Sequence, residues 1–234
     1  MTGPIPGFDR YWLEVRAHDL DTPIEIDGIK RLLNLEPGAR VFDAGCGPGR
    51  IANALAKEGM AVVGVDINPE LIEVALSDPA GAMFLPGDYL DVDLPIDNFD
   101  AVLSWHTSWG YDTDARNLAF FVRAFALLRP GGQLLLQAWN PLGIKEQMSS
   151  MHRAADGALI CEILDFDPIT LVISLDRAVL GPTGNKREKA RCLTYPFRDI
   201  CRGLLDAGFS EVAPVSVPLD HPWQILIATK SVPS

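Results

Sequence analysis

The sequence has few of the features that mark metal-binding, disulfide-bonded or membrane proteins. Its four cysteines form no C-x-x-C pair, which argues against a zinc site and against a disulfide framework. No apolar run approaches the roughly 20 residues that a membrane-spanning helix needs. The segment around Asp9 lacks the leading basic cluster of a signal peptide. We therefore expect a soluble, cytoplasmic protein that binds no metal and no membrane.

Basic side chains are also scarce. Twenty Lys and Arg stand against 31 Asp and Glu, which gives a formal net charge of −11. A polyanion partner is unfavourable at that charge unless the basic residues gather on one face, and we see no basic run. Nucleic acid is therefore not expected as a partner. The 234 residues, 48% of them hydrophobic, suffice for one domain with a sizeable core.

The chain does contain a strand–loop–helix pattern at residues 41–50, Val-Phe-Asp-Ala-Gly-Cys-Gly-Pro-Gly-Arg. The three glycines, Gly45, Gly47 and Gly49, leave backbone open to a ligand and allow positive φ where the chain turns. Cys46 lies in this loop, and two interpretations are possible, a nucleophile or a small residue tolerated there. The second is favoured because the sequence places no base beside it.

An acid precedes these glycines. The spacing G-x-G-x-G differs from the G-x-G-x-x-G of dinucleotide-binding loops, and Asp43 comes two residues before Gly45. A carboxylate at this point repels a pyrophosphate and attracts an ammonium group. The segment 43–49 closely resembles the first motif of class I S-adenosyl-L-methionine (SAM) dependent methyltransferases, whose cofactor carries an α-amino group and a sulfonium.

A second acid ends the next predicted strand, residues 61–66. Asp66 comes 21 residues after Gly45, where a carboxylate can accept hydrogen bonds from both ribose hydroxyls of a nucleoside. The alternative, an acid that only caps the following helix, is weaker because Asn68 already fits that position.

A third acid follows the predicted strand 82–85, in the sequence Gly87-Asp88-Tyr89. An acid followed by a bulky residue resembles the adenine site of the family. The alternative for Asp88 is a solvated loop acid among its acidic neighbours. A fourth segment, Leu-Arg-Pro-Gly-Gly-x-Leu at 128–134, resembles the turn that follows the fourth helix of the family.

These motifs occur in family order over residues 38–139, and the resemblance implies a set of cofactor contacts. The Asp43 carboxylate and the Gly45 backbone would surround the methionine part, Asp66 would bind the ribose, Asp88 and Tyr89 the adenine, and the Ser104 backbone would lie near the amino acid end. Gly47 and Ile67 are expected as further cofactor contacts.

The acceptor side is predicted at residues 104–111, directly after the strand 99–104, because ligands of open α/β sheets bind outside the carboxyl ends of the strands. His106 is the candidate catalytic base, since a neutral imidazole accepts a proton near pH 7. The alternative is a histidine that only positions the substrate. The aromatic residues expected to shape the substrate pocket are Trp105, Trp109, Tyr111 and Tyr195.

The N-terminal segment 7–19 has apolar residues at helical spacing. It is interpreted either as a docked terminal helix or, as in many small-molecule methyltransferases, as a lid in which Tyr11 would contact the cofactor and Trp12 the substrate. Thr22-Pro23-Ile24-Glu25 then predicts a helix start with a capping box.

We predict an α/β fold, a Rossmann-like seven-stranded, mostly parallel sheet with helices on both faces. An antiparallel β insert is expected between the fifth strand and its following helix, as a roof over the cleft. The parts are residues 1–37 as N-terminal helices or lid, 38–142 as cofactor-binding core, 143–193 as insert, and 194–234 as the C-terminal helix and hairpin. In the insert, strands are expected at 159–166, 171–180 and 189–194.

The resemblance implies SAM-dependent transfer of a methyl group to a nitrogen or oxygen of a small-molecule metabolite. The signatures of DNA-methylating enzymes, Asn/Asp-Pro-Pro-Tyr and Pro-Cys, are missing. Two alternatives are an NAD- or FAD-dependent oxidoreductase on a related fold, whose glycine spacing is absent, and a non-catalytic SAM-binding protein.

Overall fold

The computed structural model describes residues 22–78, 80–106, 108–145, 147–182, 184–218 and 220–233. Tyr11 and Trp12, predicted to contact the cofactor and the substrate, lie outside the described residues.

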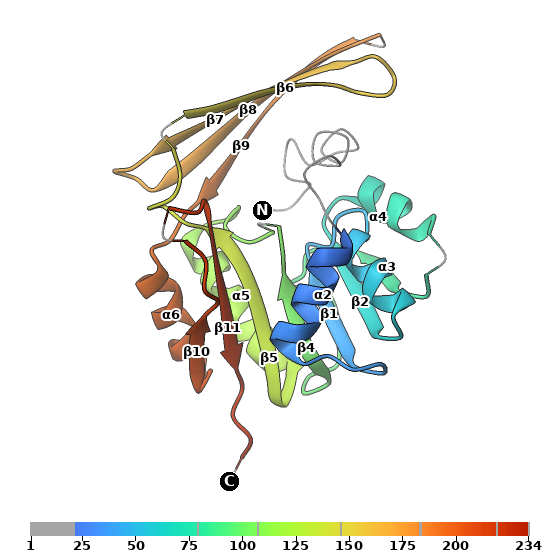
Figure 1. Ribbon diagram of the computed structural model, residues 1–234, viewed down its shortest axis with the longest axis vertical. Coiled ribbons are helices and arrows are strands. Elements are labelled where there is room, and N and C mark those ends of the chain that lie inside the picture. Colours follow the sequence, from blue (N-terminus) through green and yellow to red (C-terminus); the bar gives the residue numbers. More distant parts are fainter. Residues whose placement is uncertain are drawn as a thin grey trace.

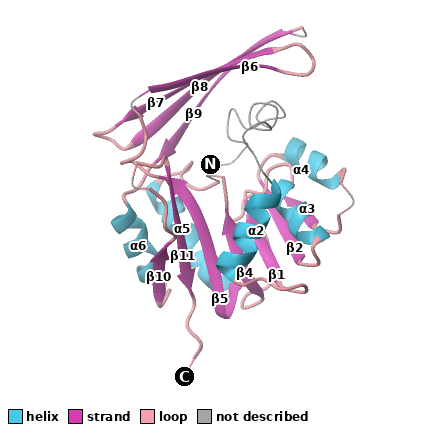
Figure 2. Cartoon of the chain, in the orientation of Figure 1, coloured by secondary structure: helices cyan, strands magenta, loops and turns pink. Residues whose placement is uncertain are grey.

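Helices and strands alternate through the first half of the described chain, and strands dominate the second half (Figures 1 and 2). The helices are α2 (Thr22–Leu33), α3 (Arg50–Lys57), α4 (Pro69–Leu76), α5 (Asp114–Leu127) and α6 (Phe197–Asp206). The strands are β1 (Arg40–Ala44), β2 (Ala61–Asp66), β3 (Met83–Pro86), β4 (Phe99–Ser104), β5 (Leu128–Trp139), β6 (Gln147–Arg153), β7 (Leu159–Asp167), β8 (Val172–Gly181), β9 (Gly184–Leu193), β10 (Glu211–Pro214) and β11 (Trp223–Thr229).

The main sheet has seven strands in the order β10-β11-β5-β4-β1-β2-β3. β1 is central and pairs in parallel with β2 and β4, while β11 runs antiparallel to both β5 and β10. The carboxyl ends of β1, β2 and β4 therefore meet at one edge, on the two sides of the point where the strand order reverses. In open α/β sheets this edge is where ligands bind.

Helices cover both faces of the sheet, as Figure 1 shows. One face packs against α2, α3 and α4 through a cluster that includes Ile29, Leu55 and Ile72. The other packs against α5 and α6 through Phe121 and Leu204. Burial of such side chains is worth roughly 1.5–3 kcal/mol each. The two apolar clusters hold the strand ends, and so the site, in fixed positions.

A second sheet is formed by the insert, in the order β6-β7-β8-β9 with antiparallel pairing throughout. It stands beyond the main sheet, at the top of Figure 1. Two of its strands, β7 and β8, were predicted at nearly these positions, whereas the third was predicted at 189–194 and β9 begins five residues earlier, at Gly184. Residues 147–153 were not predicted as a strand. The segment Gln-Met-Ser-Ser-Met-His-Arg lacks the β-branched residues by which strands are recognised. Its pairing with β7 makes it a strand.

The base of the insert is joined to the main sheet by hydrogen bonds. Leu193 N donates to Gly110 O at 2.8 Å. The two backbones are so close that a Cβ on Gly110 would lie 2.7 Å from the carbonyl oxygen of Leu193. Gln224 Nε2 on β11 donates to Trp139 O at 2.8 Å and to Tyr195 O at 2.7 Å. These bonds bind together the points where the chain leaves β5 and returns to the core.

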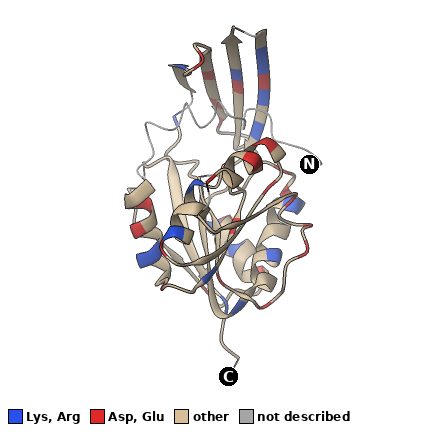
Figure 3. Ribbon diagram, turned by 90° about the vertical axis from the view of Figure 1, so that its right-hand side faces the viewer, with Lys and Arg blue, Asp and Glu red and all other residues tan. Residues whose placement is uncertain are grey.

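Basic side chains do gather in one place, on β9, although no basic run was recognised in the sequence. The strand carries Lys186, Arg187, Lys189 and Arg191, and Figure 3 shows bands of basic residues along the insert sheet. Arg187 and Lys189 are paired with Asp176 of β8, at 2.6 and 3.5 Å. Part of this positive charge is thus neutralised within the sheet.

The predicted fold class is confirmed in its two sheets and in their topology. The insert lies between β5 and α6, as expected. None of the helices in the described ranges has the length and apolar character needed to span a bilayer.

Candidate functional site

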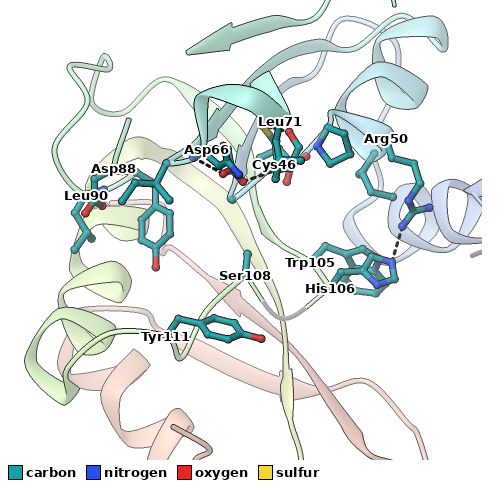
Figure 4. A pocket seen from close by; sticks show the side chains of 18 of the residues that line it. Cys46, Arg50, Asp66, Leu71, Asp88, Leu90, Trp105, His106, Ser108 and Tyr111 are labelled. Atoms are coloured by element: carbon teal, nitrogen blue, oxygen red, sulfur yellow. Dashed lines mark hydrogen bonds between the residues drawn. The ribbon is translucent and has the colours of Figure 1, made fainter. Parts of the chain in front are cut away.

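A pocket opens at the carboxyl ends of β1, β2, β3 and β4. It is an open cleft, and the space in it, counted out into the solvent at its mouth, is about 1140 Å³. Figure 4 shows Asp88 and Leu90 at one end, Arg50, Trp105 and His106 at the other, and Ser108 and Tyr111 between them. The lining residues are Asp43, Gly45, Cys46, Gly47, Pro48, Arg50, Ile51, Asp66, Ile67, Asn68, Leu71, Asp88, Tyr89, Leu90, Trp105, His106, Ser108, Tyr111, Asp112 and Arg116.

The glycine loop forms one wall of the pocket. Gly45, Gly47 and Gly49 have φ of 75°, 54° and 77°, a region that L-residues rarely adopt. A Cβ on Gly45 would lie 2.5 Å from Ser108 Cβ, whereas a Cβ on Gly47 would meet nothing within 4 Å. Gly45 is therefore required by packing, and Gly47 leaves space that a ligand can fill.

Asp43 lies at the end of β1 with only 3% of its surface exposed. None of the described residues donates a hydrogen bond to its carboxylate. Burial, with a smaller contribution from the charge of Asp66, raises the Asp43 pKa from 3.8 to about 7. A buried carboxylate without a donor, in the wall of a pocket, is a site for a cationic group.

Asp66 ends β2 and is tied to the backbone around it. Its Oδ2 accepts from Gly47 N and its Oδ1 from Asn68 N, both at 2.8 Å. Burial raises the pKa of the Asp66 carboxyl, and these two backbone bonds oppose the rise. Asn68 caps α4 by accepting from Glu70 N, as predicted. A carboxylate has about four acceptor positions, so two remain for ligand hydroxyls.

Asp88 and Tyr89 lie at the far end of the pocket. Asp88 Oδ1 accepts from Leu90 N at 2.9 Å, and its Oδ2 accepts from Arg116 Nη2 at 2.5 Å. It is therefore not the solvated loop acid of the alternative reading. The Tyr89 ring packs edge-on against Phe120 at 5.1 Å, and burial raises the pKa of its hydroxyl. Arg116, which the sequence did not single out, holds Asp88 in place.

Ser104, whose backbone is predicted to lie near the amino acid end of the cofactor, is the neighbour of a residue that lines the pocket. Ser104 is 1% exposed and lies outside the pocket lining. Its hydroxyl lies 2.9 Å from that of Ser108, which in turn donates to Ala44 O at 2.7 Å. Ser108 is the lining residue, and this chain of hydrogen bonds ties it to the ends of β1 and β4.

The four aromatic residues predicted for the substrate pocket separate into two pairs. Trp105 and Tyr111 line it. The Trp109 ring is instead stacked on Phe121 at 5.0 Å in the core, 3% exposed, and the Tyr195 ring packs on Trp109 at 4.7 Å. The expectation for Trp109 and Tyr195 is corrected: the Trp109 side chain points from this loop into the core, and Tyr195, which follows β9, packs on it there.

His106 lines the pocket, but its ring is not free. Its Nε2 lies 2.9 Å from Glu25 Oε1 and 2.5 Å from Arg50 Nη2. Glu25 was expected to complete a capping box, and its carboxylate lies instead against these two side chains. Arg50 directly follows the last glycine of the loop, a position that could have drawn attention to it; Glu25 gave no signal beyond its place in the cap.

Cys46 lines the pocket as a buried thiol. Burial, reinforced by the charges of Asp43 and Asp66, raises the pKa of its thiol well above the ordinary value. The thiol form is a poor nucleophile, in agreement with the interpretation of Cys46 as a small residue in the loop. Nowhere in the part of the chain that the structure describes do three or more His, Cys, Asp or Glu side chains come together as metal ligands.

The residues present fit SAM. The orphaned Asp43 carboxylate suits its ammonium, Gly47 leaves a cradle, and Asp66 retains acceptor positions. A seven-stranded sheet in this order, with a reversed last strand and acids at the ends of β1, β2 and β3, is the arrangement that the resemblance to class I SAM-dependent methyltransferases implies.

Comparison with known proteins agrees. Residues 41–132 match the family described as "Methyltransferase domain". SAM-bound CalS10, an amino pentose methyltransferase from Micromonospora echinaspora, superimposes with a TM-score of 0.77 at 21% identity, over 94% of this chain and 96% of that one. The sugar N-methyltransferase KedS8 from Streptoalloteichus sp. gives a TM-score of 0.79 at 18% identity, over 96% and 94%. The resemblance noted in the sequence is thereby confirmed.

Curated relatives match over shorter lengths. A ubiquinone biosynthesis O-methyltransferase of Xanthomonas campestris pv. campestris (strain B100) is 33% identical over 125 residues, half of either chain. The chain spans between about a fifth and a half of the length of the ubiquinone biosynthesis O-methyltransferases that it matches.

Proposed function

We propose that this protein transfers the methyl group of SAM to a nitrogen or oxygen of a small-molecule metabolite. The observation that carries the proposal is Asp43, a buried carboxylate that has no donor among the described residues and lies beside an open glycine loop. A cationic ligand supplies what this carboxylate lacks.

The charge of the pocket supports the same ligand. Four carboxylates line it, those of Asp43, Asp66, Asp88 and Asp112, against two guanidinium groups. Both arginines are already paired, Arg50 with Glu25 and Arg116 with acids that include Asp88. The net field is negative, which favours a ligand with ammonium and sulfonium groups and disfavours a pyrophosphate.

In the proposed complex each residue has a defined role. Asp43 binds the ammonium group, and Asp66, beside Ile67, accepts from the ribose hydroxyls. Asp88 and Tyr89 contact the adenine, and the backbone of Gly45 and Gly47 lies along the methionine chain. When bound, SAM supplies an electrophilic methyl group on a positively charged sulfur.

The acceptor binds beyond the sulfur, beside Trp105, His106 and Tyr111. Alignment of nucleophile and methyl is the main requirement of such a transfer, and these side chains provide one wall for it. A hydroxyl acceptor also needs a base, for which His106 is the candidate. An amine that reacts as the free base needs none, and this favours nitrogen because Glu25 and Arg50 already occupy Nε2 of His106.

Two similar proteins bear on the acceptor. CalS10 is an amino pentose methyltransferase and KedS8 a sugar N-methyltransferase. At such low identity they agree with an amine-bearing metabolite and do not define it.

The test is incubation of the protein with methyl-labelled SAM and a small-molecule extract of its source cells. Label is expected in a metabolite, separable by chromatography, with the wild-type protein and not with Asp66→Ala. SAM binding measured by calorimetry without any labelled product would support the non-catalytic alternative. Absence of SAM binding would refute the proposal.

A further inference from the structure

Three side chains from separate elements meet behind the acceptor end of the pocket. Glu25 comes from the first turn of α2, Arg50 from the start of α3, and His106 from the loop after β4. Arg50 Nη1 lies 2.5 Å from Glu25 Oε2 and donates to Thr22 Oγ1 at 2.9 Å. Their side chains are 18–25% exposed. Arg50 and His106 line the pocket, and Glu25 stands behind them.

The backbone of His106 is held in an unusual conformation. Its φ is +52°, a left-handed value seldom adopted outside glycine, asparagine and aspartate, although histidine tolerates it better than most. Its amide donates at 2.7 Å to Oε1 of Gln137, a residue of β5 that is 8% exposed. Backbone strain of this kind persists where surrounding groups fix it, and it is concentrated at functional sites.

The partners of the ring have opposite hydrogen-bonding capacities. A carboxylate only accepts, and a guanidinium only donates. Nε2 can therefore either donate its proton to Glu25 or accept one from Arg50, but not both at once. Because Arg50 also binds the second oxygen of Glu25, the pair remains in place in either case.

Glu25 is charged in this arrangement. Burial raises the pKa of its carboxyl, but the hydrogen bonds and charges of His106 and Arg50 outweigh burial, and the net pKa is lowered. The carboxylate form, which contacts His106 through Oε1 and forms an ion pair with Arg50 through Oε2, is the form present at neutral pH.

We propose that Glu25 and Arg50 are positioning residues of the methyl-transfer site, which together hold the His106 ring in one orientation whether its Nε2 carries a proton or not. The inference rests on the proposed function for its meaning, since the ring forms part of the wall beside the acceptor. Neither residue acts on the transferred group. They act through His106.

Because Glu25 can only accept a hydrogen bond and Arg50 can only donate one, removing each should shift the ¹⁵N resonances of the His106 ring in opposite directions. In ¹⁵N-labelled protein at pH 8, Glu25→Ala removes an acceptor from Nε2 and keeps the Arg50 donor, so the tautomer population should shift toward unprotonated Nε2. Arg50→Met removes that donor and keeps the Glu25 acceptor, so the population should shift toward protonated Nε2. The NMR signals of the His106 ring nitrogens are assigned as those that disappear from the spectrum of His106→Gln. The proposal is overturned if the ring nitrogen shifts move in the same direction in both variants, or if they do not move in either variant.

Two further variants separate positioning from simple loss of structure. Glu25→Gln retains a carbonyl that can accept from Nε2–H, so its ring shifts should return most of the way to those of the wild type. Asp27→Asn removes an exposed acid of the same helix and should change nothing. Failure of Glu25→Gln to recover any of the wild-type signature counts against the proposal, provided that its thermal unfolding is unchanged.

The kinetic readout is the labelled transfer assay described above. Glu25→Ala should lower the methyl-transfer rate by about 10- to 100-fold while SAM affinity stays within about 3-fold, because misalignment of a wall residue affects the aligned complex more than cofactor binding. A rate equal to that of the wild type would overturn the proposal. Absence of SAM binding by the wild type would instead overturn the proposed function. The opposite ¹⁵N shifts of the His106 ring in Glu25→Ala and Arg50→Met would still be expected in that case.

Discussion

Asp43 makes the stability of the ligand-free protein depend on pH. Its folded pKa is raised from 3.8 to about 7, so the folded state binds this proton more tightly than the unfolded chain does. The resulting stabilisation is fully present below about pH 4 and is lost as the pH rises through about 7. One pKa unit corresponds to about 1.4 kcal/mol, so ionised Asp43 costs the ligand-free fold roughly 4 kcal/mol above that range.

Asp43→Asn removes this dependence because an amide stays neutral. Relative to the wild type, the free energy of unfolding of the variant is expected to increase by roughly 2–3 kcal/mol more at pH 8 than at pH 5. Urea unfolding at several pH values, followed by tryptophan fluorescence, measures the difference. Asp165→Asn, at an exposed acid of β7, is the control and should show the same offset at every pH.

The same substitution should have the opposite effect on SAM. Loss of a charge-assisted hydrogen bond lowers affinity by about 10- to 100-fold. In the wild type, affinity should rise about fivefold from pH 6 to pH 7, with release of close to one proton at pH 6 and about half a proton at pH 7, measurable by calorimetry in buffers of different ionisation enthalpy. A wild-type affinity that does not change with pH, or an Asp43→Asn protein whose stability runs parallel to the wild type at all pH values, would refute the reasoning.

Three further outcomes are expected. Asp66→Ala removes the acceptor of Gly47 N and should weaken SAM binding at least tenfold by calorimetry; unchanged affinity contradicts the ribose assignment. Gly45→Ala should lower the unfolding free energy by about 1–3 kcal/mol, since its Cβ meets Ser108 and its φ is positive, and an unchanged melting temperature would contradict the packing argument. Trp109→Ala should lower it by about 3–5 kcal/mol, as a core residue does, and a normal melting temperature with a raised acceptor KM would instead place Trp109 in the pocket.

The places of the three acids in the fold could be predicted from the sequence because they are tied to strand ends. Asp43 and Asp66 lie at the ends of short apolar strands and Asp88 lies just after one, and parallel strands bring such positions to one edge. At a strand end, the local sequence pattern is enough to give the position of a residue in the folded protein. The glycines add a backbone requirement that few other residues satisfy.

The acceptor half could not be predicted in the same way. Whether Trp105 or Trp109 faces the pocket depends on the phase of a loop, which has no fixed period. The contact between Glu25 and His106 joins residues 81 positions apart and depends on how α2 crosses the sheet. The strand β6 exists because β7 offers an edge for pairing, and its own residues show little strand preference.

Among the described residues, those that line the pocket lie between Asp43 and Arg116, whereas the insert begins after β5 and ends before α6. The chain therefore leaves and rejoins the core at two neighbouring points, and none of the described residues between these points lines the pocket. Such an arrangement lets a lineage replace or reshape the insert by recombination without disturbing what binds at the glycine loop. It also defines the splice points for a chimaera: exchange of residues 143–193 for the equivalent segment of a structural neighbour replaces the insert and leaves the rest of the chain native.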